Sequence, residues 1–388
     1  MLSRLKQLVV YTLSPLLSLS FTGLASAKDS VADGESGWHL LNMPVGVTGV
    51  SRDIYELHML IFWICVWIGV AVFAVMFYSM IAHRKSTGRK PSNFHESTAV
   101  ELAWTIVPTI ILIAMAFPAT TSLVELYDTS EADMDIKITA YQWKWQYEYL
   151  GEDVQFMSEL STPETAIYNT SPKSQYYLQE VSEPLVLPVG KKVRFLITAK
   201  DVIHAWWVPD LGVKRDAIPG FINETWAKID EPGIYRGECA ELCGKGHAFM
   251  PIVVNALPEA EYQAWLADKK TAVAAERELA KKQFTLEEFM VKGEAAYNRS
   301  CAACHMANGE GIPGAFPGLK GSAVAQGPIA RHLDVVINGV PGTAMQAFGG
   351  QLSEVDLAAI ITYERNAWGN DVGDVVQPVD VLKFKQGQ

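Results

Sequence analysis

The stretch "GECAELCGKGHAFM", residues 237–250, gathers two thiols, a carboxylate, an imidazole and a thioether within fourteen residues. The side chains concerned are Cys239, Glu241, Cys243, His247 and Met250. Another imidazole, His204, lies upstream in "DVIHAWWVPD", at the end of a predicted strand. The spacing C-x3-C-x3-H-x2-M makes this stretch a candidate metal site.

Three kinds of site could use these residues: a disulfide, a zinc site or a copper site. A disulfide between Cys239 and Cys243 would leave two imidazoles and a thioether without a role. A structural zinc site would use two Cys and two His, but zinc rarely takes a thioether. Soft thiolate and thioether ligands together with imidazole favour copper. The second Cys would allow both thiolates to bridge two copper ions.

The sequence around this stretch predicts a β-domain. From about residue 132 to 256, β-branched and aromatic runs alternate with turn residues such as Pro188-Val189-Gly190 and Pro232-Gly233. Short strands at this spacing are typical of a β-sandwich or barrel. Residues 257–284 are rich in Ala, Glu and Lys and predict a helical linker with a solvated, charged face.

The N-terminal part of the chain predicts a membrane hairpin. Hydrophobic residues make up 49% of the 388-residue chain, and two long apolar segments span about 57–82 and 100–124. Each is long enough to cross roughly 30 Å of hydrocarbon as a helix. The loop between them carries four cations: Arg84, Lys85, Arg89 and Lys90. Positive loops stay in the cytoplasm, so everything after residue 125 is expected on the outer face.

A secretory signal peptide is predicted for residues 1–27. Arg4 and Lys6 precede an apolar run, and Ala25-Ser26-Ala27 is a cleavage signal after which the peptide would be cut. The alternative is an additional membrane anchor. The signal peptide predicts the same orientation as the positive loop. The formal net charge of −11 argues against nucleic acid as a partner, because a phosphate backbone attracts a basic surface.

A second motif, Cys301-Ala302-Ala303-Cys304-His305, has the C-x-x-C-H form of a c-type haem attachment site. Two thiols on one helical turn can add to the two vinyl groups of the porphyrin, and the adjacent His then lies under the iron. A thioredoxin-like C-x-x-C is the competing interpretation, but it lacks the surrounding βαβ pattern. The residues around this motif, 285–375, predict an all-α domain with helices at about 285–300, 324–338 and 353–368, followed by a tail, 376–388.

The sixth iron ligand is predicted to be Met345, in "PGTAMQAF", which lies 40 residues after His305 in a loop between two predicted helices. Met306 is next to His305 and cannot reach the opposite face of the haem. The alternative is that Met345 packs in the core and His332 or water binds instead. His332 follows Arg331 in a helical run and is expected at the surface. A Met/His pair raises the haem potential and suits electron transfer.

The segment from His204 to Met250 closely resembles the binuclear CuA site of cytochrome c oxidase subunit II, and the likeness extends from about residue 50 to 256. It implies a cupredoxin-type domain behind a two-helix anchor. On this pattern Cys239 and Cys243 bridge two copper ions. The remaining ligands implied are His204 and His247, one on each copper, Met250 as a weak ligand to one copper, and the backbone carbonyl of Glu241 to the other. The side chain of Glu241 would help to hold magnesium at the contact with subunit I.

Residues 285–375 resemble a class I cytochrome c, in which Pro317, in "GAFPGL", matches the proline whose carbonyl orients the proximal His. The alternative is a plain loop turn. Together the chain resembles subunit II of a proton-pumping oxidase with a fused cytochrome c, as in caa3-type bacterial enzymes. The fold class expected is multidomain α+β: a transmembrane hairpin within 28–125, a cupredoxin-type sandwich and the cytochrome domain.

This resemblance implies an electron relay at the outer side of a bacterial inner membrane. Electrons from a donor such as a soluble cytochrome c would reach haem c, then CuA, then haem in subunit I, where oxygen is reduced. Subunit I, and also subunit III, are the implied partners. The linker would keep the haem domain at high effective concentration near CuA.

Five further residues have weaker interpretations. Trp143 matches the family residue at which electrons enter CuA, with strand packing as the alternative. Asp216 matches an acidic position facing subunit I, or is a turn carboxylate. Glu101 matches a residue near a proton pathway, and Thr98-x-x-Glu101 is also a helix capping box. His58 and Cys65 are expected to face neighbouring helices or subunit I.

Two other functions compete with the oxidase subunit. A nitrous oxide reductase-like protein also carries CuA, but the membrane hairpin and the lack of a His-rich second copper centre argue against it. A membrane-anchored copper-delivery module would bind exchangeable copper and would have no catalytic partner. Quinol oxidase subunits lack the copper ligands and are excluded if the site is intact.

Overall fold

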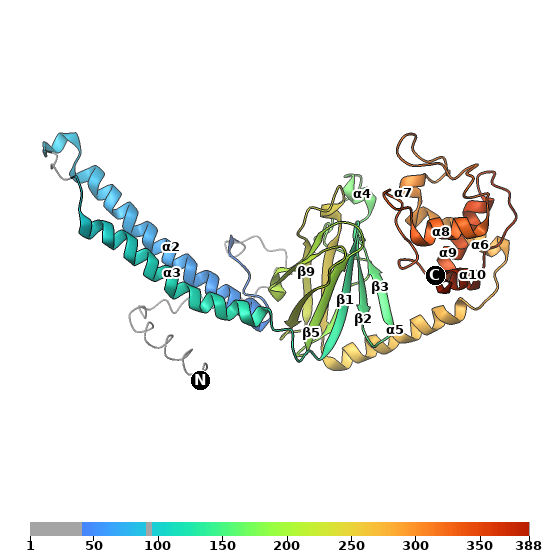
Figure 1. Ribbon diagram of the computed structural model, residues 1–388, viewed down its shortest axis with the longest axis horizontal. Coiled ribbons are helices and arrows are strands. Elements are labelled where there is room, and N and C mark those ends of the chain that lie inside the picture. The colour runs from blue at the N-terminus through green and yellow to red at the C-terminus, as the bar shows by residue number, and fades with distance from the viewer. Residues whose placement is uncertain (1–40, 91–94, 388) are drawn as a thin grey trace.

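The computed structural model describes residues 41–90 and 95–387 (Figure 1). The predicted signal peptide, residues 1–27, and its cleavage after Ala27 lie outside the described residues. From the N-terminus, Figure 1 shows a long helical hairpin, a β-domain, a single connecting helix and a small helical domain. The hairpin and the helical domain lie on opposite sides of the β-domain.

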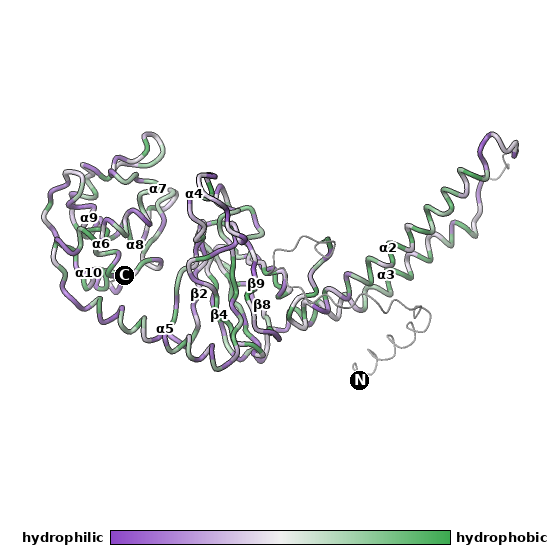
Figure 2. The backbone as a smooth tube through the Cα atoms, turned by 180° about the vertical axis from the view of Figure 1, so that it is seen from behind, coloured by the Kyte–Doolittle hydropathy of each residue, from purple (hydrophilic) through white to green (hydrophobic). Residues whose placement is uncertain are grey.

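The hairpin consists of α2 (Gly49–Ala82) and α3 (Thr98–Leu126), with the short turn η4 (Lys85–Thr87) between them. The most apolar windows of α2 and α3 have mean hydropathies of 2.7 and 2.0, and none of either window is buried inside the protein. Figure 2 shows apolar residues along both helices. Exposed apolar helices of this length are the structures that satisfy their own backbone groups inside a bilayer. Both predicted spans fall within these helices.

The helix α2 begins earlier than predicted, at Gly49, because its first turn belongs to the β-domain. Thr48 and Ser51 form a reciprocal capping box there, and both side chains are buried. Thr48 Oγ1 also donates to the carbonyl of Leu211 over 3.0 Å. A Cβ atom on Gly212 would lie 2.9 Å from Ser51 Cα, so glycine permits the close approach. The hairpin is therefore joined to the β-domain by a packed contact as well as by the chain.

The β-domain is a sandwich of two five-stranded sheets. One sheet has the order β3 (Val154–Ser158), β2 (Lys144–Tyr149), β1 (Met134–Tyr141), β5 (Lys192–Ala199), β8 (Asn223–Lys228). The other has the order β4 (Leu185–Pro188), β10 (Pro251–Leu257), β9 (Gly233–Cys239), β6 (His204–Val208), β7 (Val213–Ala217). Three short helical turns interrupt the loops: α4 (Glu164–Ile167), η5 (Pro209–Leu211) and η6 (His247–Phe249).

Alternating side chains fill the space between the sheets. Every second residue of β5 is buried, as a strand with one face on a core requires. The large residues Trp145, Tyr147 and Trp206 are fully buried. The indole of Trp206 donates to the hydroxyl of Tyr147 over 3.3 Å, which satisfies its N–H group away from water. This core holds the strand ends at fixed positions.

The connecting helix α5 (Glu259–Leu279) packs on the sandwich along its first half. Tyr262 and Leu266 are buried, and the ring centroids of Trp265 and Tyr149 lie 5.3 Å apart. Further along, Arg277 forms an ion pair with Asp153 at 3.1 Å. The sequence predicts a solvated, charged face for this linker, and the exposed side of α5 has one. The opposite side, with Tyr262, Trp265 and Leu266, packs on the β-domain and attaches the helix to it.

The helical domain packs α6 (Leu286–Ser300) across α9 (Glu354–Asn366) and adds α7 (Ala302–His305), α8 (Ile329–Asn338) and α10 (Pro378–Gln386). The helix α8 begins later than predicted, directly after Pro328, which starts a helix readily but cannot extend one backwards. The sequence predicts a tail at residues 376–388, and this prediction is wrong. Val376 and Val381 are buried in the domain core, so α10 is part of this domain.

The crossing of α6 and α9 depends on Gly293. A Cβ atom there would lie 2.2 Å from the carbonyl oxygen of Ala359. We predict that Gly293→Ala destabilises the helical domain by about 1–3 kcal/mol because the helices must separate. Helix propensity alone would favour alanine by about 1 kcal/mol, so the sign of the change tests the packing. Hydrogen exchange of α6 and α9 amides in the full-length chain measures the effect.

Asn298→Ala is the matched control, since Asn298 is exposed on the same helix. Its exchange rates are expected to stay near those of the unmodified chain. Equal protection in Gly293→Ala and Asn298→Ala would contradict the close crossing.

Candidate metal centre and cytochrome domain

The candidate metal site lies where several strands end at one edge of the sandwich. In the parallel pair β1 and β5, Ala140 is opposite Ala199, so both strands end together. The β1–β2 turn therefore lies beside the segment that leads into β6, which begins at His204. Cys239 ends β9 opposite Trp206. The strand register alone thus brings His204 and Cys239 together, although 35 residues separate them.

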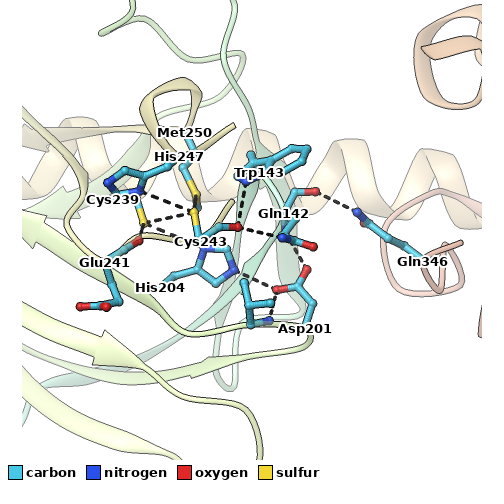
Figure 3. Close-up of polar contacts among 11 residues, drawn as sticks. Gln142, Trp143, Asp201, His204, Cys239, Glu241, Cys243, His247, Met250 and Gln346 are labelled. Carbon is cyan, nitrogen blue, oxygen red and sulfur yellow. Dashed lines mark hydrogen bonds and ion pairs between the residues drawn. The ribbon is translucent and has the colours of Figure 1, made fainter. Parts of the chain in front are cut away.

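The two thiols occupy the centre of this site, with one imidazole near each (Figure 3). The sulfur atoms of Cys239 and Cys243 are 3.8 Å apart, well beyond the roughly 2.05 Å of a disulfide bond. His204 Nδ1 lies 3.9 Å from the sulfur of Cys239, and His247 Nδ1 lies 3.6 Å from the sulfur of Cys243. His204 and both thiols are buried and close enough together to hold a metal ion.

Two weaker donors complete the cluster. The sulfur of Met250 lies 3.5 Å from that of Cys243, and Met250 is buried. The carbonyl oxygen of Glu241 lies 3.4 Å from the sulfur of Cys239. The side chain of Glu241 is exposed and extends away from the thiols. All six residues predicted from the sequence therefore converge, and Glu241 presents its backbone to the cluster while its carboxylate faces outward.

The two thiols differ in acidity. Burial raises the pKa of Cys239, but hydrogen bonds with His204 and with the backbone of Ala205 outweigh it and lower the pKa to about 7. Burial raises the pKa of Cys243 to about 12, and the charge of the neighbouring Cys239 adds to the rise. Because a charge on one thiol opposes a charge on the other, a bound cation would favour the state in which both thiols have lost their protons. Such a pair suits a site completed by metal binding.

Asp201 is a functional candidate that the sequence did not reveal. Its carboxylate lies 2.8 Å from His204 Nε2 and accepts the backbone N–H groups of Gln142 and Val202, each over 2.7 Å. Burial raises the pKa of Asp201, but these hydrogen bonds together lower it below its usual value. The pairing fixes the His204 ring so that Nδ1 faces the thiols. The signal available in the sequence was an acidic residue three positions before the histidine.

Trp143 lies in the β1–β2 turn, not on a strand, and contacts the same cluster. Its indole N–H donates to the carbonyl of Cys243 over 3.2 Å, and the side-chain amide of Gln142 donates to the same oxygen over 2.8 Å. A Cβ atom on Gly246 would lie 2.2 Å from the Trp143 ring, so the ring packs flat on the metal-site loop. Trp143 is therefore in van der Waals contact with the loop that carries His247.

In the helical domain, Cys301 caps the one-turn helix α7, which carries Cys304 and His305. Both thiols and the imidazole therefore lie on a single turn, as the C-x-x-C-H chemistry requires. His305 Nδ1 lies 2.9 Å from the carbonyl oxygen of Pro317, in agreement with the family pattern. This contact leaves Nε2 as the nitrogen available to an iron ion.

Met345 lies in the loop between α8 and α9, half-buried against the domain core. The prediction that His332 lies at the surface is wrong. His332 is 2% exposed, and its Nε2 lies 2.7 Å from the buried carboxylate of Glu364. The reason is that α8 turns His332 inward with Leu333 while Arg331 remains exposed. The buried Glu364 on α9 provides His332 with a hydrogen-bond partner, so His332 can be buried although the sequence pattern predicts it at the surface.

The weaker candidates have the following positions. Glu101 is in the first turn of α3, but the predicted capping box is absent: the helix is capped at Ser97, without a side-chain bond, so Thr98 already lies inside it. Asp216 is a half-exposed residue of β7, not of a turn, 3.9 Å from Lys214. His58 and Cys65 are on α2, where His58 Nε2 lies 3.0 Å from the Asn42 side-chain oxygen and Cys65 is exposed.

Three family models match the chain in succession. Residues 36–121 match the cytochrome c oxidase subunit II transmembrane domain, and residues 134–257 match the periplasmic domain of the same subunit. Residues 289–363 match the model described as cytochrome c oxidase, cbb3-type, subunit III. The fold and these matches define a membrane protein with a cupredoxin-like domain and a cytochrome c domain. The predicted fold class is confirmed.

Individual relatives agree. A probable cytochrome c oxidase subunit 2 of Rickettsia bellii is 36% identical over 226 residues, covering 58% of this chain and 82% of the relative. Cytochrome c oxidase subunit 2 of Alkalihalophilus pseudofirmus is 30% identical over 334 residues, covering 81% of this chain and 87% of the relative. The solved periplasmic domain of Bradyrhizobium japonicum subunit II is 39% identical, covers 37% of this chain and 99% of that domain, and gives a TM-score of 0.34.

The chain therefore belongs to the cytochrome c oxidase subunit 2 family. As a subunit II it is part of a cytochrome c oxidase complex, so its partners include other oxidase subunits. The subunit II domain is consistent with CuA, and the cytochrome c domain implies a haem.

We predict that Asp201→Ala weakens metal binding by about 10–100-fold, because His204 loses the partner that fixes its ring. Competition with a chelator on the full-length chain in detergent measures the affinity. Asp268→Ala is the matched control, since Asp268 is exposed on α5 and is far along the chain from the site. Unchanged affinity in Asp201→Ala would mean that the strand register alone orients His204.

Proposed function

We propose that this chain is the electron-accepting subunit II of a cytochrome c oxidase, with binuclear CuA in the β-domain and covalent haem c in the helical domain. One observation carries the copper assignment. Two buried thiols 3.8 Å apart, each with an imidazole near it, provide two bridging ligands and two terminal ligands. A mononuclear zinc site would not use the thioether of Met250 or the carbonyl of Glu241, which lie against the thiols.

The donor set suits two copper ions that share one electron. Thiolate, thioether and imidazole are ligands that copper prefers. The ligands are attached to strand ends and to a loop fixed by Trp143 and Gln142, so their positions change little when the charge of the site changes. In this arrangement Cys239 and Cys243 bridge, His204 and His247 bind one copper each, and Met250 and the Glu241 backbone are the weak ligands.

The haem assignment depends on α7. Cys301 and Cys304 are proposed to form the two thioether bonds, and His305, oriented by the Pro317 carbonyl, to bind the iron. Met345 is proposed as the opposite axial ligand. Histidine and methionine together raise the haem potential and favour electron transfer over oxygen chemistry.

Within the complex, the chain is proposed to accept electrons from an external donor such as a cytochrome c and to pass them through its two domains to subunit I. Oxygen reduction to water and proton pumping would take place in that partner. The two apolar helices favour a multi-pass membrane placement, and the positive loop between them favours both domains on the outer side. The membrane is proposed to be the bacterial inner membrane, with that outer side facing the periplasm.

Four residues have proposed roles at the boundaries of the relay. Trp143 would receive electrons next to the copper site, since its indole is bonded to the Cys243 carbonyl. The exposed carboxylate of Glu241 would bind magnesium shared with subunit I, and Asp216 would face the same partner. Glu101, in the first turn of α3, would lie near a proton pathway.

We predict that the purified full-length chain contains two copper ions and one covalent haem, with a near-infrared mixed-valence copper band. Cys243→Ser should abolish that band, because one thiolate cannot bridge both ions. Cys65→Ser, at an exposed thiol on α2, should leave it unchanged. One copper per chain, or zinc, would refute the CuA assignment. Copper that exchanges freely and is not reduced by the haem would favour a copper-delivery module.

For the haem, we expect Met345→Ala to abolish the near-infrared Met–iron absorption band and to lower the haem potential. Met306→Ala is the matched control, since Met306 is exposed and adjacent to His305. An optical spectrum of the oxidised chain measures the band, and an optically monitored redox titration measures the potential, in each variant. A band that survives in Met345→Ala would assign the axial position to another residue.

A further inference from the structure

The helical domain rests directly on the turn that contacts the metal site. The side-chain amide of Gln346 donates to the backbone carbonyl of Gln142 over 2.9 Å. The side-chain amide of Gln146 donates in the opposite direction, to the carbonyl of Gly350, over 2.8 Å. Residues 346–350 of the helical domain therefore pair with the turn and first part of the β1–β2 hairpin, residues 142–146.

The contact also includes one charged side chain, which lies near an aromatic ring. The Lys144 ammonium group lies 5.9 Å from the centre of the Phe348 ring, within reach of a cation–π interaction. Burial lowers the pKa of Lys144, and the nearby carboxylate of Glu159 acts in the opposite direction. The two hydrogen bonds themselves join neutral amides to carbonyls. Such a contact is less sensitive to salt than a contact between opposite charges would be.

Gln142 connects this contact to the metal site. Its side-chain amide donates to the Cys243 carbonyl over 2.8 Å, and its backbone N–H donates to Asp201 over 2.7 Å (Figure 3). Gln346 directly follows Met345, the proposed iron ligand. Two side chains and two hydrogen bonds thus lead from the Met345 backbone to the backbone of a proposed copper ligand. In the described part of the chain, Trp143 has no hydrogen bond to the helical domain.

We propose that Gln346 and Gln142 are positioning residues that dock the cytochrome domain on the copper domain and form the route by which electrons cross between them. The inference rests on the proposed function. Each crossing would remove one electron from a ferrous haem held by the helical domain, leaving it ferric, and would add that electron to a copper centre held by the β-domain. No bond forms or breaks and no proton moves. Trp143 donates to the same Cys243 carbonyl, so it provides a separate approach for electrons that do not come through Gln346.

The test uses the assembled oxidase with the variant Gln346→Glu. This side chain has the same shape, but its carboxylate cannot donate a hydrogen bond and would face the Gln142 carbonyl oxygen. Electron transfer from haem to copper, followed optically after flash injection of one electron into the haem, is expected to slow by about three- to tenfold. Hydrogen exchange of amides in 142–146 and 346–350 is expected to accelerate. Gln386→Glu, at an exposed position of α10, should change neither quantity.

Two further variants distinguish the docking of the helical domain from the electron route through Gln346 and Gln142. Gln146→Ala removes the Gly350 bond but leaves the link from Gln346 to Gln142 in place. It should accelerate exchange as Gln346→Glu does, with a smaller effect on the transfer rate. Gln346→Asn is too short to reach Gln142 and should slow transfer without adding charge. The Met345 absorption band serves as a check that Gln346 variants retain the iron ligand.

An unchanged transfer rate in both Gln346 variants would overturn the inference. Equal slowing in Gln146→Ala and Gln346→Glu would also overturn it, because docking alone would then account for the effect. The proposed function fails separately: an unmodified chain in which the haem never reduces the copper would refute the relay itself.

Discussion

The parallel pairing of β1 with β5 is the constraint on which the rest of the structure depends. Because Ala140 lies opposite Ala199, the two strands end at the same level. The turn after β1 then meets the segment after β5, where Asp201 accepts the Gln142 backbone N–H and lies beside His204. Sliding this register by one residue would turn the strand side chains to the opposite faces and separate Asp201 from the Gln142 backbone N–H. The β1–β5 pairing therefore places the docking turn beside Asp201, and the β6–β9 pairing in the other sheet brings His204 and Cys239 together.

The aromatic core makes that register rigid. Trp145 and Trp206, one from each sheet, are fully buried next to the site, and the Trp145 ring lies 6.2 Å from the His204 ring. The Trp145 indole also donates to the Met250 carbonyl over 3.3 Å. A densely packed core of this kind resists small displacements, so the ligands it carries keep their separations. This rigidity is what an electron-transfer centre needs, since a site that rearranges on reduction transfers electrons slowly.

The sequence predicted chemistry better than it predicted packing. The spacing of Cys239, Cys243, His247 and Met250 indicated which residue types could meet, because metal chemistry restricts the ligands. The position of Asp201 depended on strand register, which no local pattern reveals. His332 was misplaced since a helical run shows its own periodicity but not the buried Glu364 that satisfies it. The assignment of 376–388 to a tail failed for a similar reason: Val381 finds its partners in helices far back in the chain.

The helical domain is held to the β-domain in two ways: strongly through the helix α5, and weakly through the docking contact at residues 142–146 and 346–350. The helix α5 is fixed to the sandwich by buried Tyr262 and Leu266, whereas the docking contact has two neutral hydrogen bonds and one cation–π pair. Each neutral hydrogen bond contributes only about 0.5–1.5 kcal/mol, so the contact by itself would be transient. A tether that keeps the two surfaces close raises their effective concentration to the millimolar range or above and makes a weak contact sufficient. The same weakness lets the domain leave the turn, which would free the surface around Trp143 for an external donor. In the proposed relay, the two approaches to the Cys243 carbonyl would then serve electrons from different sources at different times.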